Sequence, residues 1–398
     1  MKKVALAAIV VFALLGSLVA GLQVVEVAKA DYRTITVPDE YSSIQGAIDN
    51  AVNGDTIYVK KGVYVENPVI NKSVSLVGED KDATLIDVTS GLNVESNSVT
   101  IRGFTIYDGW HGISLSGNHC SILGNRITNS THGIVLFGYE NQIADNVFES
   151  IGLSSAIQLN RAYRNLVTKN YIDSCVEGIQ IWQSSNNNTV TENTIINCRN
   201  TAIGFQYSNN NTIMRNNITN SGCGTSIYGS NNNVITNNNY VNNSVQFSAN
   251  EDYYLTFGHN RSVNTINENY WSDYKGTDAN GNGIGDTSYV IDSYNRDNNP
   301  LMDATSLNLP QTTPLPVSTP TPASTSTLTP SPSSSQSPSA SNFPTPSPSQ
   351  QPTTEQSSTP PIHGTPPTFT ILHVLAAITI AAIIVAIVAV VYSKRRRK

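Results

Sequence analysis

The stretch SSNNNTVTENTIINC (184–198) is followed by SNNNTIMRNNITNSG (208–222), in which Asn211 and Asn216 stand 23 residues after Asn188 and Asn193. The pattern extends in both directions, with steps of 21 to 24 residues between successive asparagines of one column: Asn125, Asn146, Asn170, Asn193, Asn216 and Asn238. A second column stands five residues earlier: Cys120, Asn141, Asn165, Asn188, Asn211 and Asn233. Self-similarity at a period of about 20 to 50 residues is typical of repeat folds.

The short-range pattern inside each unit predicts strands. Segments such as Gly112–Leu115, Gly133–Leu136 and Gly178–Ile181 alternate apolar and polar residues, as a strand with one buried face does. Two further apolar positions per unit mark two more short strands, and no helical period persists across the unit. Three strands in a coil of about 22 residues, each bonded to the next coil, predict an all-β fold, a right-handed parallel β-helix.

The asparagine columns support this register. Asparagine tolerates left-handed turn geometry, and amides stacked about 4.8 Å apart can bond along a column. The residues just before four of these asparagines alternate in sign, namely Asp145, Lys169, Glu192 and Arg215. Opposite charges on neighbouring strands attract, so this alternation favours the same alignment.

The cysteines occupy related positions. Cys175 and Cys198 each stand five residues after a repeat asparagine, which places them on adjacent rungs at about 5 Å, within disulfide range. We expect a bridge between them, with two buried thiols as the alternative, and leave Cys120 and Cys223 unassigned.

Both ends of the chain have membrane-related patterns. Residues 1–30 have a basic start, an apolar run and the Ala-Lys-Ala pattern of a signal peptide. Residues 369–392 form an apolar segment long enough to span a bilayer, and the basic tail 393–398 predicts a cytoplasmic C-terminus. Residues 304–368, rich in Pro, Ser and Thr, predict a disordered stalk.

We therefore expect a β-helix domain over 31–303, with a cap and first rungs at 31–98, regular repeats at 99–240, and an insertion and cap at 241–303. Without the predicted signal and tail, 15 basic and 28 acidic residues remain, which argues against nucleic acid as a partner. An exported domain is compatible with N-glycosylation at seven sequons: Asn71, Asn129, Asn187, Asn210, Asn217, Asn242 and Asn260.

Two longer stretches resemble known proteins. Residues 34–103 (TITVPDEYSSIQGAIDNAVNGDTIYVKKGVYVENPVINKSVSLVGED…) look like the cap and first rungs of pectin-lyase-like β-helices, with Ile44–Val52 as a plugging helix. The repeats and the closing NYWSDYKGTDANGNGIGDTSYVIDSYNRDNNPLM (269–302) resemble the NosD-type family with carbohydrate-binding and sugar-hydrolase (CASH) repeats. The resemblance implies carbohydrate binding, polysaccharide cleavage or copper handling. The membrane-anchored architecture resembles that of archaeal surface proteins.

Polysaccharide cleavage requires carboxylates on one open face. Glu149 and Asp173 share a column on adjacent rungs, and Glu177 follows closely, so these three are the candidate catalytic residues. A solvated face is the alternative interpretation. Candidate ligand-binding residues are an outward amide column and an aromatic column beside it, whose rings could stack on sugars or on each other: Gln158 and Gln180, and Phe137, Trp182 and Tyr228.

Two candidate metal sites follow from residue types. His111 and His132 share a column and offer imidazole ligands of the kind that copper takes, with plain turn residues as the alternative. Asp278, Asn280, Asn282 and Asp286 alternate around glycines, as oxygen ligands do in calcium loops; an Asn/Gly-rich capping turn is the alternative.

The sequence therefore predicts an extracellular, single-pass membrane protein whose β-helix binds glycans or contributes to the cell envelope. The alternatives are a polysaccharide lyase or hydrolase on the same scaffold and a NosD-like copper accessory protein. Calcium is the cofactor that the sequence suggests, and a surface polysaccharide is the partner.

Overall fold

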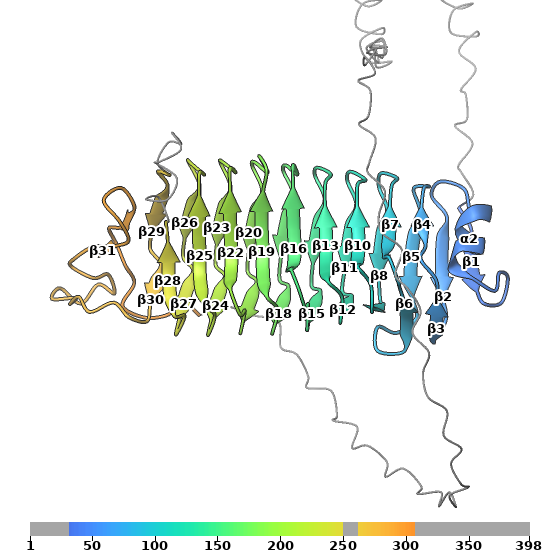
Figure 1. Ribbon diagram of the computed structural model, residues 1–398, viewed down its shortest axis with the longest axis horizontal. Helices are drawn as coiled ribbons and strands as arrows, with labels where there is room; N and C mark the ends of the chain where they lie inside the picture. Colours follow the sequence, from blue (N-terminus) through green and yellow to red (C-terminus); the bar gives the residue numbers. More distant parts are fainter. Residues whose placement is uncertain (1–31, 250–261, 307–398) are drawn as a thin grey trace, which may run out of the picture. The chain divides into compact units, whose positions relative to one another are not determined.

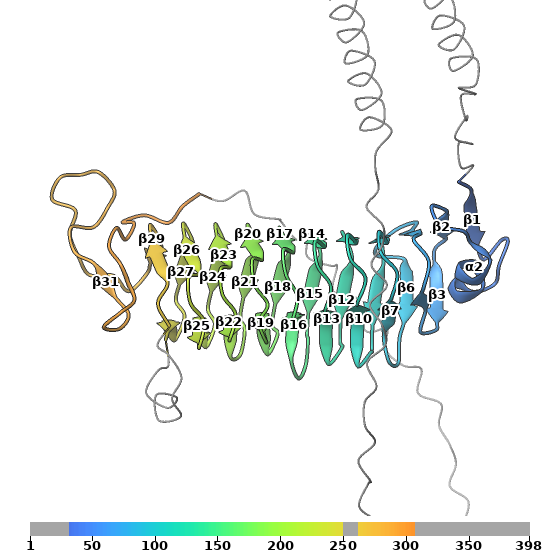
Figure 2. The ribbon, with the colours of Figure 1, turned by 90° about the horizontal axis from the view of Figure 1, so that it is seen from above.

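The computed structural model describes residues 32–249 and 262–306, which form a right-handed-type parallel β-solenoid of about ten turns. Three long sheets run along the solenoid, and each turn of the chain contributes one short strand to each sheet (Figure 1). The view from above shows the same stacking of turns from α2 at one end to β31 at the other (Figure 2). The expected parallel β-helix is confirmed.

Sheet A has 13 strands and contains the only antiparallel pair of strands in the described part of the chain: β1 (Thr34–Val37), β2 (Thr56–Val59), β5 (Ser75–Gly78), β8 (Thr100–Arg102), β11 (Ser121–Leu123), β14 (Gln142–Ala144), β17 (Leu166–Thr168), β20 (Thr189–Thr191), β23 (Thr212–Met214), β26 (Val234–Thr236), β29 (Thr265–Asn267), β32 (Arg296–Asp297) and β31 (Tyr289–Val290).

Sheet B has ten strands: β3 (Gly62–Val65), β6 (Thr84–Asp87), β9 (Thr105–Tyr107), β12 (Arg126–Thr128), β15 (Val147–Glu149), β18 (Tyr171–Asp173), β21 (Thr194–Ile196), β24 (Asn217–Thr219), β27 (Asn239–Val241) and β30 (Tyr270–Trp271). Sheet C has nine, and they include the longest strands: β4 (Val69–Ile70), β7 (Leu92–Val94), β10 (His111–Leu115), β13 (His132–Leu136), β16 (Ser155–Asn160), β19 (Glu177–Trp182), β22 (Thr201–Gln206), β25 (Cys223–Tyr228) and β28 (Val245–Ser248).

Apolar side chains fill the inside of the solenoid in columns, one from each sheet. In sheets A and B, the middle residue of each three-residue strand points inward and is buried, as the alternating pattern requires. In sheet A these residues are Ile101, Ile122, Ile143, Val167, Val190, Ile213, Ile235 and Ile266. Because each turn buries its apolar residues against the turns on either side, the core is continuous from one end to the other.

Two ladders of asparagine side chains join successive turns. The first ladder lies between sheets A and B and contains Asn125, Asn146, Asn170, Asn193, Asn216, Asn238 and Asn269; the second lies between sheets C and A and contains Asn141, Asn165, Asn188, Asn211, Asn233, Asn264 and Asn295. Asn193 is typical: its Nδ2 donates to Val167 O and to Asn216 Oδ1, each at 3.0 Å. Its Oδ1 accepts from the backbone N–H of Asn170, also at 3.0 Å. Each side chain thus satisfies buried backbone groups that the strands leave unpaired.

The explanation of these asparagines by left-handed backbone geometry is wrong. The ladder residues do not have positive φ; the residue just before each one does in the first ladder, as at Lys169 (φ 55°), Glu192 (57°) and Arg215 (54°), and in the second ladder as far as Asn233. The turn therefore places its strained residue outward, where side-chain type matters little. The asparagine that follows keeps an ordinary backbone and points its amide inward.

The alternating charges lie on these left-handed positions. Lys169 Nζ lies 3.9 Å from a carboxylate oxygen of Glu192, and Arg215 lies 3.8 Å from the other oxygen. Among the described residues, Asp145 forms no ion pair with Lys169, so two of the three expected contacts are present. Exposed pairs of this kind contribute little energy, but they confirm the predicted register.

Both ends of the solenoid are covered. Helix α2 (Ile44–Asn50) buries Ile44, Ala47 and Ile48 against the first turns, so the expected plugging helix is present but ends before Val52. At the other end, Trp271 is stacked between the rings of Tyr240 (4.4 Å) and Tyr289 (4.3 Å). Flat aromatic rings close the apolar interior where no further turn follows.

The predicted signal peptide (1–30), the transmembrane segment (369–392) and the basic tail lie outside the described residues, as does nearly all of the stalk (304–368). In the part of the chain that the structure describes, no helix has both the length and the apolar composition needed to cross a bilayer.

Candidate functional site

The outward face of sheet C carries three columns of polar and aromatic side chains. Parallel pairing aligns Ser155, Glu177, Thr201 and Cys223 in one column, and Gln158, Gln180, Gly204 and Ser226 in the next. The third column runs Asn160, Trp182, Gln206 and Tyr228. The predicted amide column of Gln158 and Gln180 is therefore confirmed.

The three predicted aromatic residues share one column, as expected, but their rings do not contact one another. Gln206 stands between Trp182 and Tyr228, and Asn160 stands between Trp182 and Phe137, which directly follows Leu136, the partner of Leu159. Aromatic and amide side chains thus alternate from turn to turn, and the three rings do not stack on one another. They offer separated apolar surfaces on a polar face.

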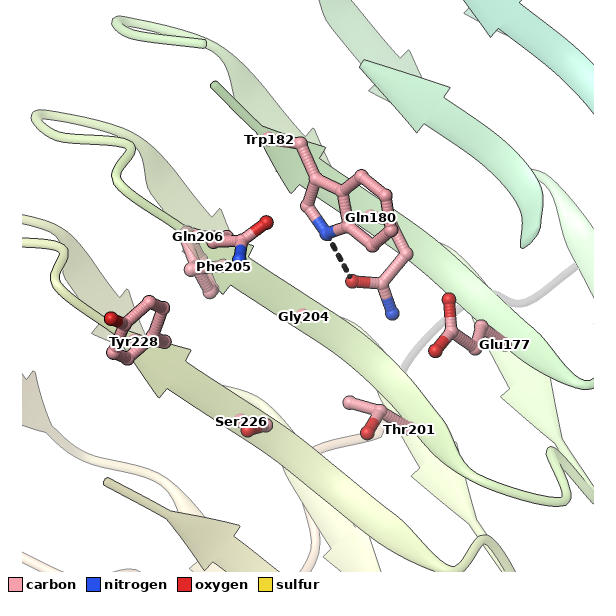
Figure 3. Close-up of a pocket in the computed structure, with 9 residues that line it drawn as sticks. All are labelled: Glu177, Gln180, Trp182, Thr201, Gly204, Phe205, Gln206, Ser226 and Tyr228. Atoms are coloured by element: carbon pink, nitrogen blue, oxygen red, sulfur yellow. Dashed lines mark hydrogen bonds between the residues drawn. The ribbon is translucent and has the colours of Figure 1, made fainter. Parts of the chain in front are cut away.

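A groove opens on this face across β19, β22 and β25 (Figure 3). Its volume is about 310 Å³. The residues that line this groove are Glu177, Gln180, Trp182, Thr201, Gly204, Phe205, Gln206, Ser226 and Tyr228. The groove crosses three strands, so its length over successive turns is about 10 Å at the usual strand spacing. It can therefore hold a short segment of a chain-like ligand.

Gly204 creates the depression. Its neighbours in the column, Gln180 and Ser226, carry side chains, whereas Gly204 leaves a gap between them. The Gln180 amide folds over this gap, because a Cβ at position 204 would lie only 2.0 Å from Gln180 Oε1. Trp182 Nε1 donates to Gln180 Oε1 at 3.0 Å and fixes the amide there (Figure 3). The floor of the groove is thus an oriented amide beside an indole ring.

Glu177 supplies the groove's carboxylate. Ser155 Oγ donates to Glu177 Oε2 at 3.2 Å, and Ser155 itself is fully buried. Burial raises the pKa of the Glu177 carboxyl above its ordinary value, with the Ser155 hydrogen bond acting in the opposite direction. Among the residues that the structure describes, no lysine, arginine or histidine lines the groove or pairs with this carboxylate.

The other two candidate catalytic residues lie elsewhere. Glu149 and Asp173 are register partners as predicted, but they belong to sheet B and do not line the groove. Glu149 accepts from Arg126 at 3.0 Å, and Asp173 accepts from Ser174 and Asn197 at 2.8 and 2.9 Å. Each carboxylate is held by different partners, so the structure does not bring the three together as an acid–base group.

The two histidines are register partners on β10 and β13, as predicted, with ring centroids 4.9 Å apart. The indole of Trp110 packs beside them, 5.8 Å from the His132 ring. In both histidines Nδ1 is buried without a hydrogen-bond partner. Burial lowers the pKa of each imidazole; the neighbouring His132 lowers that of His111 further, and a backbone hydrogen bond to Trp110 partly offsets the effect at His132. The described residues contain no group of three or more potential metal-binding side chains.

The candidate calcium loop forms a tight turn held by its own side chains. Asp278 accepts from the backbone N–H groups of Gly281 and Gly283, each at 2.8 Å, and Asp286 accepts from Ala279 at 2.8 Å. Asn282 Oδ1 accepts from Ile284 N at 2.9 Å. These contacts fit the capping-turn alternative, while each carboxylate keeps lone pairs that a hard cation could use.

All four cysteines are free thiols, so the expected Cys175–Cys198 bridge is not formed and the alternative of two buried thiols describes the structure. Burial raises the pKa of Cys175 to about 12. It also raises that of Cys198, where the neighbouring Cys175 adds to the effect. Enclosure among apolar side chains favours the neutral thiol and makes both groups unreactive.

Five of the predicted sequons are exposed on turns: Asn71, Asn129, Asn187, Asn210 and Asn242. Asn217 is half-buried on β24, and Asn260 lies outside the described residues. None of the described sequon asparagines belongs to a strand of sheet C. Sugars at these positions would therefore leave the strands that form the groove unmodified.

The family model described as periplasmic copper-binding protein (NosD) matches residues 42–276 of the chain. The chain belongs to the NosD family. No curated protein sequence matches this NosD-family chain significantly.

Solved structures with a similar fold include an alginate lyase from Paenibacillus sp. str. FPU-7, with 14% identity, a TM-score of 0.39, and coverage of 59% of this chain and 95% of the lyase. The A-module of the mannuronan C-5 epimerase AlgE4 from Azotobacter vinelandii has 14% identity and a TM-score of 0.40, with 60% of this chain and 87% of that chain covered. The Dettilon tailspike protein has 16% identity and a TM-score of 0.43, with 60% and 62% covered.

The sequence analysis did not predict five groove residues of this NosD-family protein: Thr201, Gly204, Phe205, Gln206 and Ser226. A usable signal was present, because Gly178-Ile179-Gln180 aligns with Ala202-Ile203-Gly204 once the asparagine register is carried into sheet C. Gly204 then appears as the one position of its column between β16 and β25 without a side chain. That observation alone predicts a depression.

Proposed function

We propose that this NosD-family protein is a membrane-anchored surface protein that binds glycans through the groove on sheet C. The observation that supports the proposal is the composition of the groove: an indole and a phenol ring beside two amides, two hydroxyls and one carboxyl. Sugar rings offer apolar faces and hydroxyl edges, so an aromatic surface flanked by neutral donors and acceptors is complementary to them.

Binding is better supported than catalysis. Hydrolysis by acid–base chemistry requires a second positioned carboxylate, and Glu177 is the only one that lines the groove. The lyase or hydrolase alternative still makes a distinct prediction, because an active enzyme would release shorter products.

The test is retention of the full chain on immobilised polysaccharides and titration with soluble oligosaccharides, with product release recorded in parallel. Trp182→Ala should weaken binding by at least about tenfold, equal to about 1.4 kcal/mol, as loss of a central aromatic contact does. Tyr163→Ala is the matched control, because it removes a half-exposed ring outside the groove. Equal losses in both variants, or retention that does not depend on Trp182, would contradict the proposal. Products that disappear in Glu177→Gln would favour the enzyme instead.

The proposed location rests on the sequence patterns at 1–30 and 369–398. External protease applied to intact cells should remove the β-helix and leave the basic tail protected. A protein that is fully protected, or that fractionates without membranes, would contradict this arrangement.

A second candidate function, binding of a copper ion, is favoured by the two histidines. Two imidazoles 4.9 Å apart, each with an unpartnered buried Nδ1, offer the ligand type that copper prefers. Calorimetry of the full chain with copper should show one site that is lost in His111→Asn and His132→Asn alike, while His119→Asn retains it. Binding that survives both substitutions would exclude this pair.

A further inference from the structure

The charge on the residues that line the groove is negative only. The residues that line it include one carboxylate, Glu177, and no cation. Arg161 and Arg199, which lie near the same strands in sequence, do not line the groove, and neither contributes to the shift in the pKa of Glu177. Every other polar lining group is a neutral amide, hydroxyl or indole N–H. Nothing in the groove therefore offers a charge-assisted contact to an acid.

We infer that the groove selects uncharged glycans and rejects the corresponding uronic-acid polymers, with Glu177 as the specificity-determining residue. The inference rests on the proposed function. It goes beyond it by naming the class of sugar and the group that discriminates.

The physical reason is like-charge coupling in a partly buried site. Glu177 is held in place by the fully buried Ser155 and cannot swing freely away from a ligand. A sugar carboxylate that enters the groove places a second anion near the first, and two carboxylates without a cation between them do not both stay ionised at low cost. Binding an acidic chain would therefore require uptake of a proton. A neutral sugar has no such requirement, because its hydroxyls can donate to Glu177 and exchange hydrogen bonds with Gln180, Thr201 and Ser226.

The test compares pairs of oligosaccharides that differ only at C6: β-1,4-mannohexaose with its hexamannuronate counterpart, and cellohexaose with its uronate counterpart. Each is titrated into the full chain at pH 7. For the pair that binds, the neutral member should be at least about tenfold tighter, the equivalent of one pKa unit of charge coupling. Lowering the pH to 5 should narrow this ratio.

Glu177→Gln should reduce the ratio of neutral to acidic affinity at pH 7 by at least about fivefold. It should also abolish the pH dependence of that ratio, because the variant no longer carries the discriminating charge. Glu192→Gln removes one negative charge from a turn outside the groove, where the glutamate faces Lys169 and Arg215, and should leave the ratio unchanged. This control separates a local effect from a change in net charge.

The outcomes distinguish the two levels of the argument. Acidic chains that bind as tightly as neutral ones, in a manner that depends on Trp182, would overturn the inference and leave glycan binding standing. The same holds if the ratio is unchanged in Glu177→Gln. If none of the chains binds, or if binding ignores Trp182, glycan binding at the groove is overturned and the inference with it.

Discussion

Asn269 donates from Nδ2 to Oδ2 of Asp297 at 3.1 Å, and with this contact the first asparagine ladder ends on a carboxylate. Asp297 is fully buried. Its oxygens also accept from the backbone N–H groups of Glu268, Asn269 and Asn299 and from Trp271 Nε1, at 2.8 to 3.1 Å. An acceptor-only side chain suits this position, because no further turn follows to receive an amide N–H.

Asp297→Asn should therefore destabilise the solenoid, although asparagine continues the ladder elsewhere. Its Nδ2 would face donors that now bond to a carboxylate oxygen, and leaving buried donors unsatisfied costs about 1–3 kcal/mol. Urea unfolding of the full chain measures the change. Asp303→Asn, at an exposed position nearby, should stay within about 0.5 kcal/mol of the parent. An Asp297→Asn variant as stable as the parent would show that the ladder does not need a carboxylate at its end.

Gly204→Ala should weaken glycan binding with little loss of stability. The new Cβ would lie 2.0 Å from Gln180 Oε1, so the flexible amide must leave the indole N–H that fixes it. We expect a loss on the order of tenfold in affinity, comparable to the net contribution of one hydrogen bond. Gly152→Ala is the matched control, because nothing lies within 4 Å of its Cβ. Unchanged affinity in Gly204→Ala would separate the amide from binding.

The buried thiols predict slow alkylation and a loss of stability in alkali. The pKa of Cys175 is raised from 9.0 to about 12 in the folded protein. The folded state therefore holds a proton that the unfolded state releases, and its contribution, fully present below pH 9, is lost as the pH rises toward 12. Iodoacetamide at pH 8 should modify Cys175 only after unfolding, as mass spectrometry can show. Rapid modification of the native chain, or a disulfide on non-reducing gels, would contradict the free, buried thiols.

The histidine pair predicts a loss of stability in mild acid. The pKa values of His111 and His132 lie below the ordinary value of 6.5, so the unfolded state binds more protons below that pH. Stability should be full above pH 6.5 and should fall as the pH drops through the lower, folded pKa values. Thermal unfolding at pH 7.5 and 5.0 measures this slope, which should flatten in the His111→Asn/His132→Asn double variant. An identical slope in the double variant would place its origin elsewhere.

Calcium binding at 278–286 remains a prediction. If Asp278 and Asp286 hold the ion, calcium should raise the unfolding temperature of the full chain. At a calcium concentration 100 times the dissociation constant, the free energy of unfolding should rise by about 2.7 kcal/mol, provided the unfolded state does not bind calcium. Magnesium is the matched control, because it demands a stricter octahedral geometry. The gain should vanish in Asp278→Asn, and an unfolding temperature that is equal with calcium and with chelator would rule the site out.

Much of the fold follows from residues visible in the sequence. The spacing of Asn146, Asn170 and Asn193 predicted the register, and the apolar positions two residues later predicted the inward column. Partners such as Glu149 with Asp173, and His111 with His132, follow directly because one register applies to every strand of a coil. This success has a physical reason: in a solenoid each contact is with the neighbouring turn, so local periodicity determines long-range pairing.

The shape of the groove could not be predicted from the sequence, because it depends on side-chain contacts that form only in the tertiary structure. Side chains on one column can bond along the strand, across it or to the next column, and no repeat spacing specifies which. Gln180 folds over Gly204 because Trp182 holds its amide, and Glu177 turns to Ser155 rather than to Asp173. The sequence by itself determined the columns, because backbone pairing sets them. The tertiary structure decided which side chains meet, because packing and hydrogen bonding choose among the rotamers that each column allows.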